Sequence, residues 1–276
     1  AAEALTYGVF AQLAEIAGVQ VRAVRIDREG MDPEALAGLC ATGDVRAVYC
    51  NPTFHNPTAG VMGQERRHAL AEVARRFNVM LIEDDPIGAL YENGPPPLAA
   101  IAPDVTWHVS AMTKVLAQGM RVAFLVAPTI AARENLVAAF GRLSHWMAAP
   151  LMAAIVSHLI ERGHARVIAD EIAAENRARG LQAAACLPRA SFFGSIESPH
   201  IWLPYRPLVA RRMASVLERR EVLVRHDGAF AVKPDAENGG LRISLSSPPD
   251  REALAIGLRI VAEIISENAA VENVSV

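Results

Sequence analysis

The sequence has few cysteines, no surplus of positive charge and no long apolar run. Its three cysteines, Cys40, Cys50 and Cys186, form no C-x-x-C pair, which favours a reduced, cytoplasmic protein without structural zinc. The formal net charge of -3 gives no electrostatic reason to expect nucleic-acid binding by this segment. The longest apolar stretches are about ten residues, roughly half of what a membrane-spanning helix needs. We therefore expect no membrane segment.

Several catalytic signatures are also missing. No G-x-x-x-x-G-K-[ST] loop accompanies the acidic pair Asp84–Asp85, which argues against a nucleotide hydrolase that holds magnesium there. Ser110 and Lys114 are four residues apart, so they do not form the S-x-x-K motif of acyl transfer. The histidines show no H-E-x-x-H spacing, and we expect no metal site.

The chain begins without an initiator methionine or a basic n-region. We therefore expect no signal peptide, and we expect the chain to start inside a longer protein. With 276 residues, 52% of them hydrophobic and 21% charged, it can bury a sizeable core and suits one large domain plus a smaller one.

Short apolar segments alternate with amphipathic ones in the first part of the chain. The pattern predicts strands at 19–26, 45–50, 79–82, 105–109 and 121–127, and helices at 32–39 and 64–77. This alternation indicates an α/β domain with a mostly parallel sheet. A helix at 167–185 follows, and then strands at 195–203, 222–224 and 241–245 with helices at 208–219 and 251–267. We expect a large α/β domain over 1–165 and a small α+β domain over 166–276.

Four polar residues stand next to the apolar strands of the first domain. Asn56 lies in the loop after one strand, Asp84 ends the next, Lys114 follows the third, and Arg121 opens the fourth. Ligands of open α/β sheets bind outside the carboxyl ends of the strands, so one site can gather these residues. Three of them have a bland alternative: a turn-forming asparagine for Asn56, a polar strand end for Asp84 and a solvated surface residue for Lys114.

Pyridoxal 5′-phosphate (PLP) requires this set of groups. A deprotonated lysine amine attacks the aldehyde of the cofactor, and desolvation or nearby positive charge lowers its pKa toward that state. A carboxylate keeps the pyridine nitrogen protonated, which makes the ring an electron sink. An amide donates to the ring oxygen, and an arginine binds the phosphate with paired hydrogen bonds.

Four segments resemble class I/II aminotransferases of PLP fold type I. They are Asn51-Pro-Thr-Phe-His-Asn56-Pro-Thr-Ala-Gly60, Leu81-Ile-Glu-Asp84-Asp-Pro86, Ser110-Ala-Met-Thr-Lys114-Val-Leu-Ala-Gln-Gly119-Met-Arg121 and Leu241-Arg242-Ile-Ser244. Their order and separation are similar to the aminotransferase-like domain of MocR-type regulators of the GntR family. The resemblance implies a three-layer αβα large domain, PLP as cofactor and a homodimer.

The resemblance also implies a role for each core residue. Lys114 is expected to bind the cofactor covalently and to move the proton during amino transfer. Asp84 is expected to face the pyridine nitrogen, Asn56 the ring oxygen O3′, and Arg121 the phosphate.

Further residues of the resemblance lie outside this core. Arg242 is expected to bind the carboxylate of an amino acid or 2-oxo acid. Tyr7 and Pro86 are expected on the two ring faces, although Tyr7 suits plain packing equally well. Ser110 is the nearest serine to the phosphate, because Ala111 stands where the family usually has one.

The sequence departs from the family pattern at two places. Ile87 occupies the place of a tyrosine that usually donates to O3′, and the glycine-rich phosphate segment expected upstream of Tyr7 is absent from this chain.

Two functions fit the resemblance. The chain is expected to be either part of an aminotransferase or the PLP- or amino-acid-sensing domain of a DNA-binding regulator. In the second case DNA is contacted by a separate N-terminal winged helix.

Overall fold

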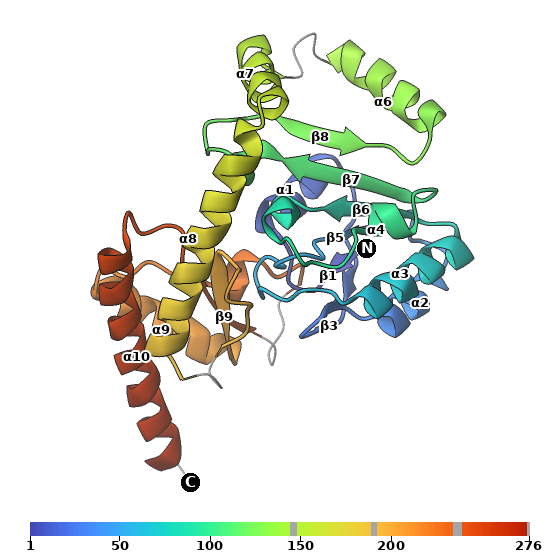
Figure 1. Cartoon of the computed structure of the whole chain (residues 1–276). Helices are drawn as coiled ribbons and strands as arrows, with labels where there is room; N and C mark the ends of the chain where they lie inside the picture. The colour runs from blue at the N-terminus through green and yellow to red at the C-terminus, as the bar shows by residue number, and fades with distance from the viewer. Residues whose placement is uncertain (144–147, 189–191, 234–238, 275–276) are drawn as a thin grey trace. The chain divides into compact units, whose positions relative to one another are not determined.

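The computed structural model describes residues 1–143, 148–188, 192–233 and 239–274 (Figure 1). Contacts divide the chain into two compact units. The first consists of Ala1–Glu3, Arg22–Thr53 and Val61–Ala173, and the second of Ala4–Val21, Phe54–Gly60 and Ala174–Val276. The expected division at 165/166 stays a prediction. It falls in helix α8 (His164–Cys186), a few residues before the last change of unit.

A six-stranded sheet forms the centre of the first unit. Its strand order is β2-β1-β5-β6-β7-β8, and all neighbours are parallel except β7 and β8, which are antiparallel. The strands are β1 (Ala2–Glu3), β2 (Ala23–Val24), β5 (Ala47–Cys50), β6 (Met80–Asp84), β7 (Thr106–Ala111) and β8 (Ala123–Val126). The mostly parallel sheet predicted from the alternating pattern is thus confirmed, and Figure 1 shows β6, β7 and β8 side by side.

Two helices pack on one face of this sheet for reasons visible in the sequence. Asp32 caps α2 (Pro33–Cys40) by accepting from two backbone amides, and Pro33 occupies its first turn, where a proline loses no hydrogen bond. Helix α3 (Gln64–Phe77) ends at Asn78, which takes a left-handed conformation, as asparagine often does after a helix. The buried residues of these helices share one hydrophobic cluster with Val48, Leu81 and their neighbours.

Several shorter or outer elements complete the first unit. They are the β3–β4 hairpin (Ile26–Asp27 and Gly30–Met31), η1 (Gly88–Leu90), α4 (Leu98–Ile101), α5 (Met112–Val115), α6 (Ile130–Leu143) and α7 (Pro150–Glu161). In the described part of the chain, no helix is both long and apolar enough to cross a membrane.

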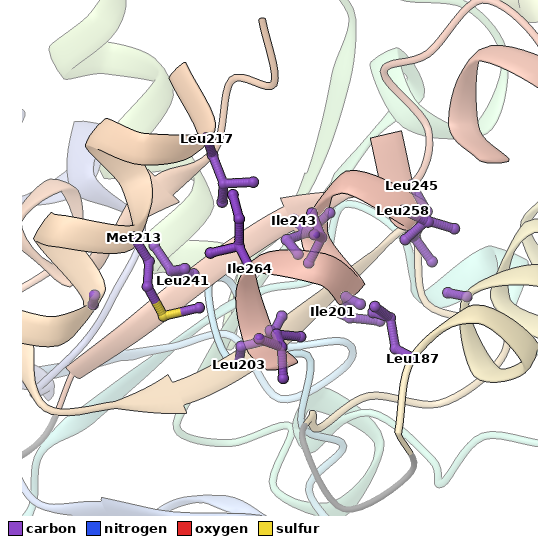
Figure 2. Close-up of a cluster of buried hydrophobic side chains, with 14 of the residues drawn as sticks. Leu187, Ile201, Leu203, Met213, Leu217, Leu241, Ile243, Leu245, Leu258 and Ile264 are labelled. Carbon is purple, nitrogen blue, oxygen red and sulfur yellow. The ribbon is translucent and has the colours of Figure 1, made fainter. Parts of the chain in front are cut away.

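The second unit contains an antiparallel three-stranded sheet in the order β10-β11-β9. Its elements are α1 (Gly8–Ile16), β9 (His200–Tyr205), α9 (Pro207–Arg219), β10 (Arg225–His226), η3 (Asp227–Ala229), β11 (Gly239–Ser244) and α10 (Arg251–Val274). Figure 2 shows its core, in which leucine, isoleucine and methionine side chains from β9, α9, β11 and α10 meet. The α+β pattern predicted for this part of the sequence is confirmed.

The differences from the predicted elements have local causes. The strand predicted over 19–26 is reduced to two short pieces, because Val19 still belongs to the turn that closes α1. The strand predicted at 222–224 begins later, at Arg225, because Val222 donates its N–H to Leu217 at the end of α9.

The core of the second unit yields a stability prediction. Leu203 has no exposed surface, and we expect Leu203→Ala to lower the free energy of unfolding by about 2–5 kcal/mol. Leu208 on α9 is 80% exposed, so Leu208→Ala should change it by no more than about 0.5 kcal/mol. Urea unfolding of both variants is the measurement. Equal changes in the free energy of unfolding for the two variants would contradict the burial of Leu203 in this core.

Candidate functional site

Three predicted site residues lie at one edge of the six-stranded sheet. Strands β6 and β7 are parallel and end at Asp84 and Ala111, and α5, which carries Lys114, begins directly after β7. Strand β8 runs in the opposite direction, so Arg121, two residues before it, belongs to the same edge. Chain topology therefore brings Asp84, Lys114 and Arg121 to one edge, as the sequence predicts.

The Asp84 carboxylate is held by a tyrosine on the neighbouring strand. Tyr49 lies on β5, is buried, and donates its hydroxyl to Oδ2 of Asp84. Burial raises the pKa of Asp84 above its ordinary value, and the hydrogen bond from Tyr49 opposes this by favouring the carboxylate. Burial and the adjacent carboxylate raise the pKa of Tyr49, so the phenol stays protonated and remains a donor.

The backbone at the end of β6 is braced as well. Asn51 donates its side-chain amide to the main-chain oxygen of Asp84. The backbone N–H of Asn51 in turn donates to Oε2 of Glu3 at 3.1 Å. Glu3 is fully buried, so these bonds tie the ends of β1, β5 and β6 together and fix where the Asp84 side chain starts.

Lys114 and Arg121 belong to an anchored loop. Thr113 donates its hydroxyl to the Met120 carbonyl at 3.3 Å. The buried side chains of Leu116 and Val122 pack against Val156 of α7. Both cationic side chains stay exposed on this fixed loop, so they are available to a ligand.

Ser110 differs from the other candidates in the face of the sheet that it occupies. Asp84 is in register with Val109, and side chains alternate between faces along a strand. Ser110 therefore points to the opposite face from Asp84. Pro86 is half-buried just past β6, and Ile87 is buried at 7% exposure.

The face that carries Ser110 also holds a buried ion-pair network that sequence reasoning did not anticipate. Arg67 of α3 and Glu83 of β6 are both fully buried, with 3.5 Å between Nη1 and Oε1. Glu83 also accepts from the backbone amides of Leu98 and Ala99 and lies 2.8 Å from Nδ1 of His108. This hydrogen bond raises the pKa of His108 and favours its imidazolium form.

Asp85 is the third acidic residue on this stretch and shares the face of Glu83. It is 9% exposed, and its Oδ1 is buried without a hydrogen-bond partner among the described residues. Burial, followed by the charge of Glu83, raises the pKa of Asp85 to about 6, while His108 and Arg67 act in the opposite direction. The Gly88 backbone N–H favours the ionised form by a hydrogen bond.

Asn56 lies in a tightly folded loop of the second unit. The Asn56–Pro57 peptide bond is cis, and Ala59 takes a positive φ of 57°. His55 and Thr58 are buried in this loop, with 2.7 Å between Nδ1 and Oγ1. The loop backbone is therefore fixed around Asn56 by its own contacts.

Arg242 and Tyr7 also belong to the second unit. Arg242 lies on β11 in register with Trp202, and its buried Nε has no hydrogen-bond partner within the described residues. Burial lowers the pKa of Arg242, and the interaction with Tyr7 partly offsets this. Tyr7 stands just before α1 and is 42% exposed. A half-buried arginine with an unused donor suits a carboxylate ligand.

The comparisons with known proteins give the family. A family model described as aminotransferase class I and II matches residues 1–258. The chain belongs to the class I and II aminotransferases. It is 25% identical to the uncharacterized HTH-type transcriptional regulator YdeF of Bacillus subtilis, over 95% of this chain and 56% of YdeF. It is 29% identical to PtsJ of Salmonella typhimurium, named a vitamin B6 salvage pathway transcriptional repressor, over 86% of this chain and 54% of PtsJ.

Solved aminotransferases share the fold. An archaeal alanine:glyoxylate aminotransferase superposes with a TM-score of 0.81 at 26% identity, covering 96% of this chain and 68% of that one. The predicted PLP fold type I is thereby confirmed. This class I/II aminotransferase chain spans about half the length of the two curated relatives.

The residues missed by sequence reasoning are those that act through contacts distant in sequence. Tyr49 precedes Asp84 by 35 positions, and the only signal was an aromatic residue beside the end of a predicted strand. Arg67 sat in a helix with many charges, where a buried arginine has no local signature. No group of histidine, cysteine and carboxylate residues that suits a metal ion occurs in the described ranges.

The raised pKa of Asp85 predicts a pH-dependent stability difference. A protonated Asp85 favours the folded state below the unfolded pKa of about 3.9, and this contribution is lost as pH rises through about 6. Asp85→Asn removes the effect. Between pH 4 and pH 7, we expect the free energy of unfolding of the variant to rise by about 2 kcal/mol relative to that of the unsubstituted protein.

Urea unfolding of both proteins across this pH range is the measurement. Asp104→Asn is the matched control, because Asp104 is exposed and its bond to Arg75 lowers its pKa. That variant should show a small dependence of the opposite sign. A pH-independent difference between Asp85→Asn and the parent would contradict the prediction.

Proposed function

We propose that this chain is the PLP-binding body of an aminotransferase-type protein that handles an amino acid and a 2-oxo acid. The observation that carries the proposal is the half-buried Asp84 carboxylate, oriented by Tyr49, at the same sheet edge as Lys114 and Arg121. Asn56, Tyr7 and Arg242 belong to the second unit, and we assign cofactor and substrate binding to them as well.

The residues present fit the cofactor. Tyr49 occupies Oδ2 of Asp84, which leaves Oδ1 for a cationic ring nitrogen. When bound, PLP supplies an aldehyde for covalent attachment and a cationic ring that stabilises negative charge at the substrate Cα. Because a positive charge lowers the pKa of a nearby carboxyl group, we expect Asp84 to be ionised in the loaded protein.

The remaining roles follow from the chemistry of each side chain. Lys114 would hold the aldehyde group of PLP through Nζ, and its free amine would take the proton from the substrate Cα. Arg121 binds the phosphate, and Asn56 donates to the ring oxygen. Arg242 binds the substrate carboxylate through paired hydrogen bonds, and Tyr7 covers one ring face. We include Pro86 on the other ring face. Ser110, which the sequence predicts near the phosphate, lies on the opposite sheet face from Asp84, so we leave it out of the proposed site.

A second function has its own support. YdeF and PtsJ are both named as transcriptional regulators, and PtsJ is named as a repressor of vitamin B6 salvage. Ile87 is buried where the resemblance expects a tyrosine hydroxyl, which removes one donor to the ring oxygen. The parent protein is therefore either an aminotransferase or a regulator in which this body senses PLP or an amino acid. We place either protein in the cytoplasm as a homodimer.

Amino-transfer assays on the whole parent protein separate the two functions. Turnover of an amino acid and a 2-oxo acid at roughly 1 per second or faster marks an enzyme. Saturable PLP binding with turnover far below that rate marks a sensor. DNA binding by the whole protein that responds to PLP supports the regulator directly.

The covalent anchor is testable because the chain has only two lysines, Lys114 and Lys233. With PLP added, we expect the unsubstituted chain to show a visible absorbance band. After borohydride reduction, we expect a cofactor adduct on the peptide that contains Lys114. Lys114→Ala should lose both signals because its amine is gone. Lys233→Ala should keep both. An adduct found only on Lys233 or only on the N-terminal amine would contradict Lys114 as the attachment site.

The role of Tyr49 predicts a coupling between two substitutions. Tyr49→Phe removes the donor that orients Asp84, and we expect PLP affinity to fall about fivefold, the equivalent of about 1 kcal/mol. Asp84→Asn should weaken PLP binding more strongly, because it removes the partner of the ring nitrogen. In the Asp84→Asn background, Tyr49→Phe should have little further effect.

Fluorescence titration with PLP gives the affinities for this cycle, and Tyr91→Phe serves as the control because Tyr91 borders the other face of the sheet. A merely structural tyrosine would weaken binding equally in both backgrounds. Additive effects of the two substitutions would therefore rule out positioning through Asp84.

A further inference from the structure

A cavity of about 330 Å³ lies in the first unit on the sheet face opposite Asp84. Asp85, which directly follows β6, His108 and Ser110 of β7, and residues of the 88–97 segment line it. Its volume is at the lower end of the range for small-molecule sites, which starts near about 300 Å³. The cavity therefore has room for a small-molecule ligand.

One end of this cavity offers an unused acceptor. Asp85 is nine-tenths buried, and its Oδ1 accepts no hydrogen bond from any described residue. Buried polar atoms are paired in almost all native structures, and each exception calls for an explanation such as a ligand or ordered water. A ligand that donates to Asp85, above all an ammonium group, supplies the missing partner.

Another side chain of the wall offers a donor. His108 bonds Glu83 through Nδ1 at 2.8 Å, and this bond favours the imidazolium form. In that form Nε2 also carries a hydrogen, and no described residue accepts from it. An imidazolium donor prefers a charged acceptor such as a carboxylate.

The charged side chains at and behind the cavity wall form two pairs of opposite sign. Glu83 is offset by Arg67, with which it forms a buried ion pair. The charge of Asp85 is then offset by that of His108. Two opposite charges with no net surplus suit a ligand that carries one group of each sign, whereas a simple cation or anion satisfies only one of them.

We propose that this cavity binds a small zwitterionic amino acid, with its ammonium group on Asp85 and its carboxylate on His108. The site is separate from the PLP site, because alternation along β6 places Asp84 and Asp85 on opposite faces of the sheet. The proposal does not depend on PLP binding, and its ligand meets Asp85 rather than Lys114 or Arg242.

The test uses three probes that separate the two charged groups. Glycine carries both groups, methylamine only the ammonium and acetate only the carboxylate. Calorimetric titration of the full chain at pH 7, above the pKa of Asp85 of about 6, should show saturable glycine binding with a Kd on the order of 1 mM. Methylamine and acetate should each bind at least about tenfold more weakly, a loss of about 1.4 kcal/mol.

Variants assign the binding to this cavity. Asp85→Asn keeps the shape but removes the charge, and it should weaken glycine binding at least about tenfold. Ala89→Leu fills the cavity from its exposed rim and keeps both charged side chains, and it should weaken binding similarly. Circular dichroism confirms that each variant is folded.

Arg242→Gln distinguishes this site from the proposed aminotransferase site. Glycine binding to the cavity should survive that substitution, whether or not PLP binds. Loss of glycine binding in Arg242→Gln would assign the ligand to the other site and overturn the proposal. Unchanged binding in Asp85→Asn, or methylamine binding as tight as glycine binding, would overturn it as well, as would a parent protein that glycine does not saturate at about 100 mM.

Discussion

Three consecutive acidic residues end strand β6, and the alternation of side chains along the strand divides them between two environments. Glu83 and Asp85 face α3 and the cavity, while Asp84 faces the other side, where Tyr49 meets it. Placing three carboxylates on one face would concentrate like charges in a buried region, at a large electrostatic cost. The pleat of the strand avoids this and lets each face provide its own counter-groups.

The counter-groups differ in strength between the two faces. Glu83 has no exposed surface, and it meets the guanidinium of Arg67, two backbone amides and the ring of His108. Asp84 receives a neutral hydroxyl from Tyr49, and within the described residues it forms no ion pair. An external positive charge therefore stabilises the ionised form of Asp84, and a cofactor with a pyridinium ring provides one.

The sequence allowed much of this arrangement to be predicted, because the signals concerned were local. Apolar runs and helical stripes located β5, α3, β6 and β7, and the position of Asp84 at a strand end followed from them. The partners of Asp84 and Glu83 were not predictable in this way. Tyr49 and Arg67 reach them across strands and layers, through contacts that the spacing of residues along one chain does not encode. Ser110 shows that a local signal can also mislead. It is close to Lys114 in sequence, but that closeness does not determine which face of the sheet its side chain occupies.

The division into units shows how far sequence order and compact structure diverge. The chain passes between the two units five times, after residues 3, 21, 53, 60 and 173. Residues at the start of the chain contribute backbone hydrogen bonds to the second unit, as Thr6 does with Phe230 and Val232 with Ala4. A polypeptide cut once near residue 173 would leave the C-terminal piece without α1 and without the loop around Asn56. The second unit is thus an assembly of three chain segments, and neither unit corresponds to one continuous stretch of sequence that could be expressed by itself.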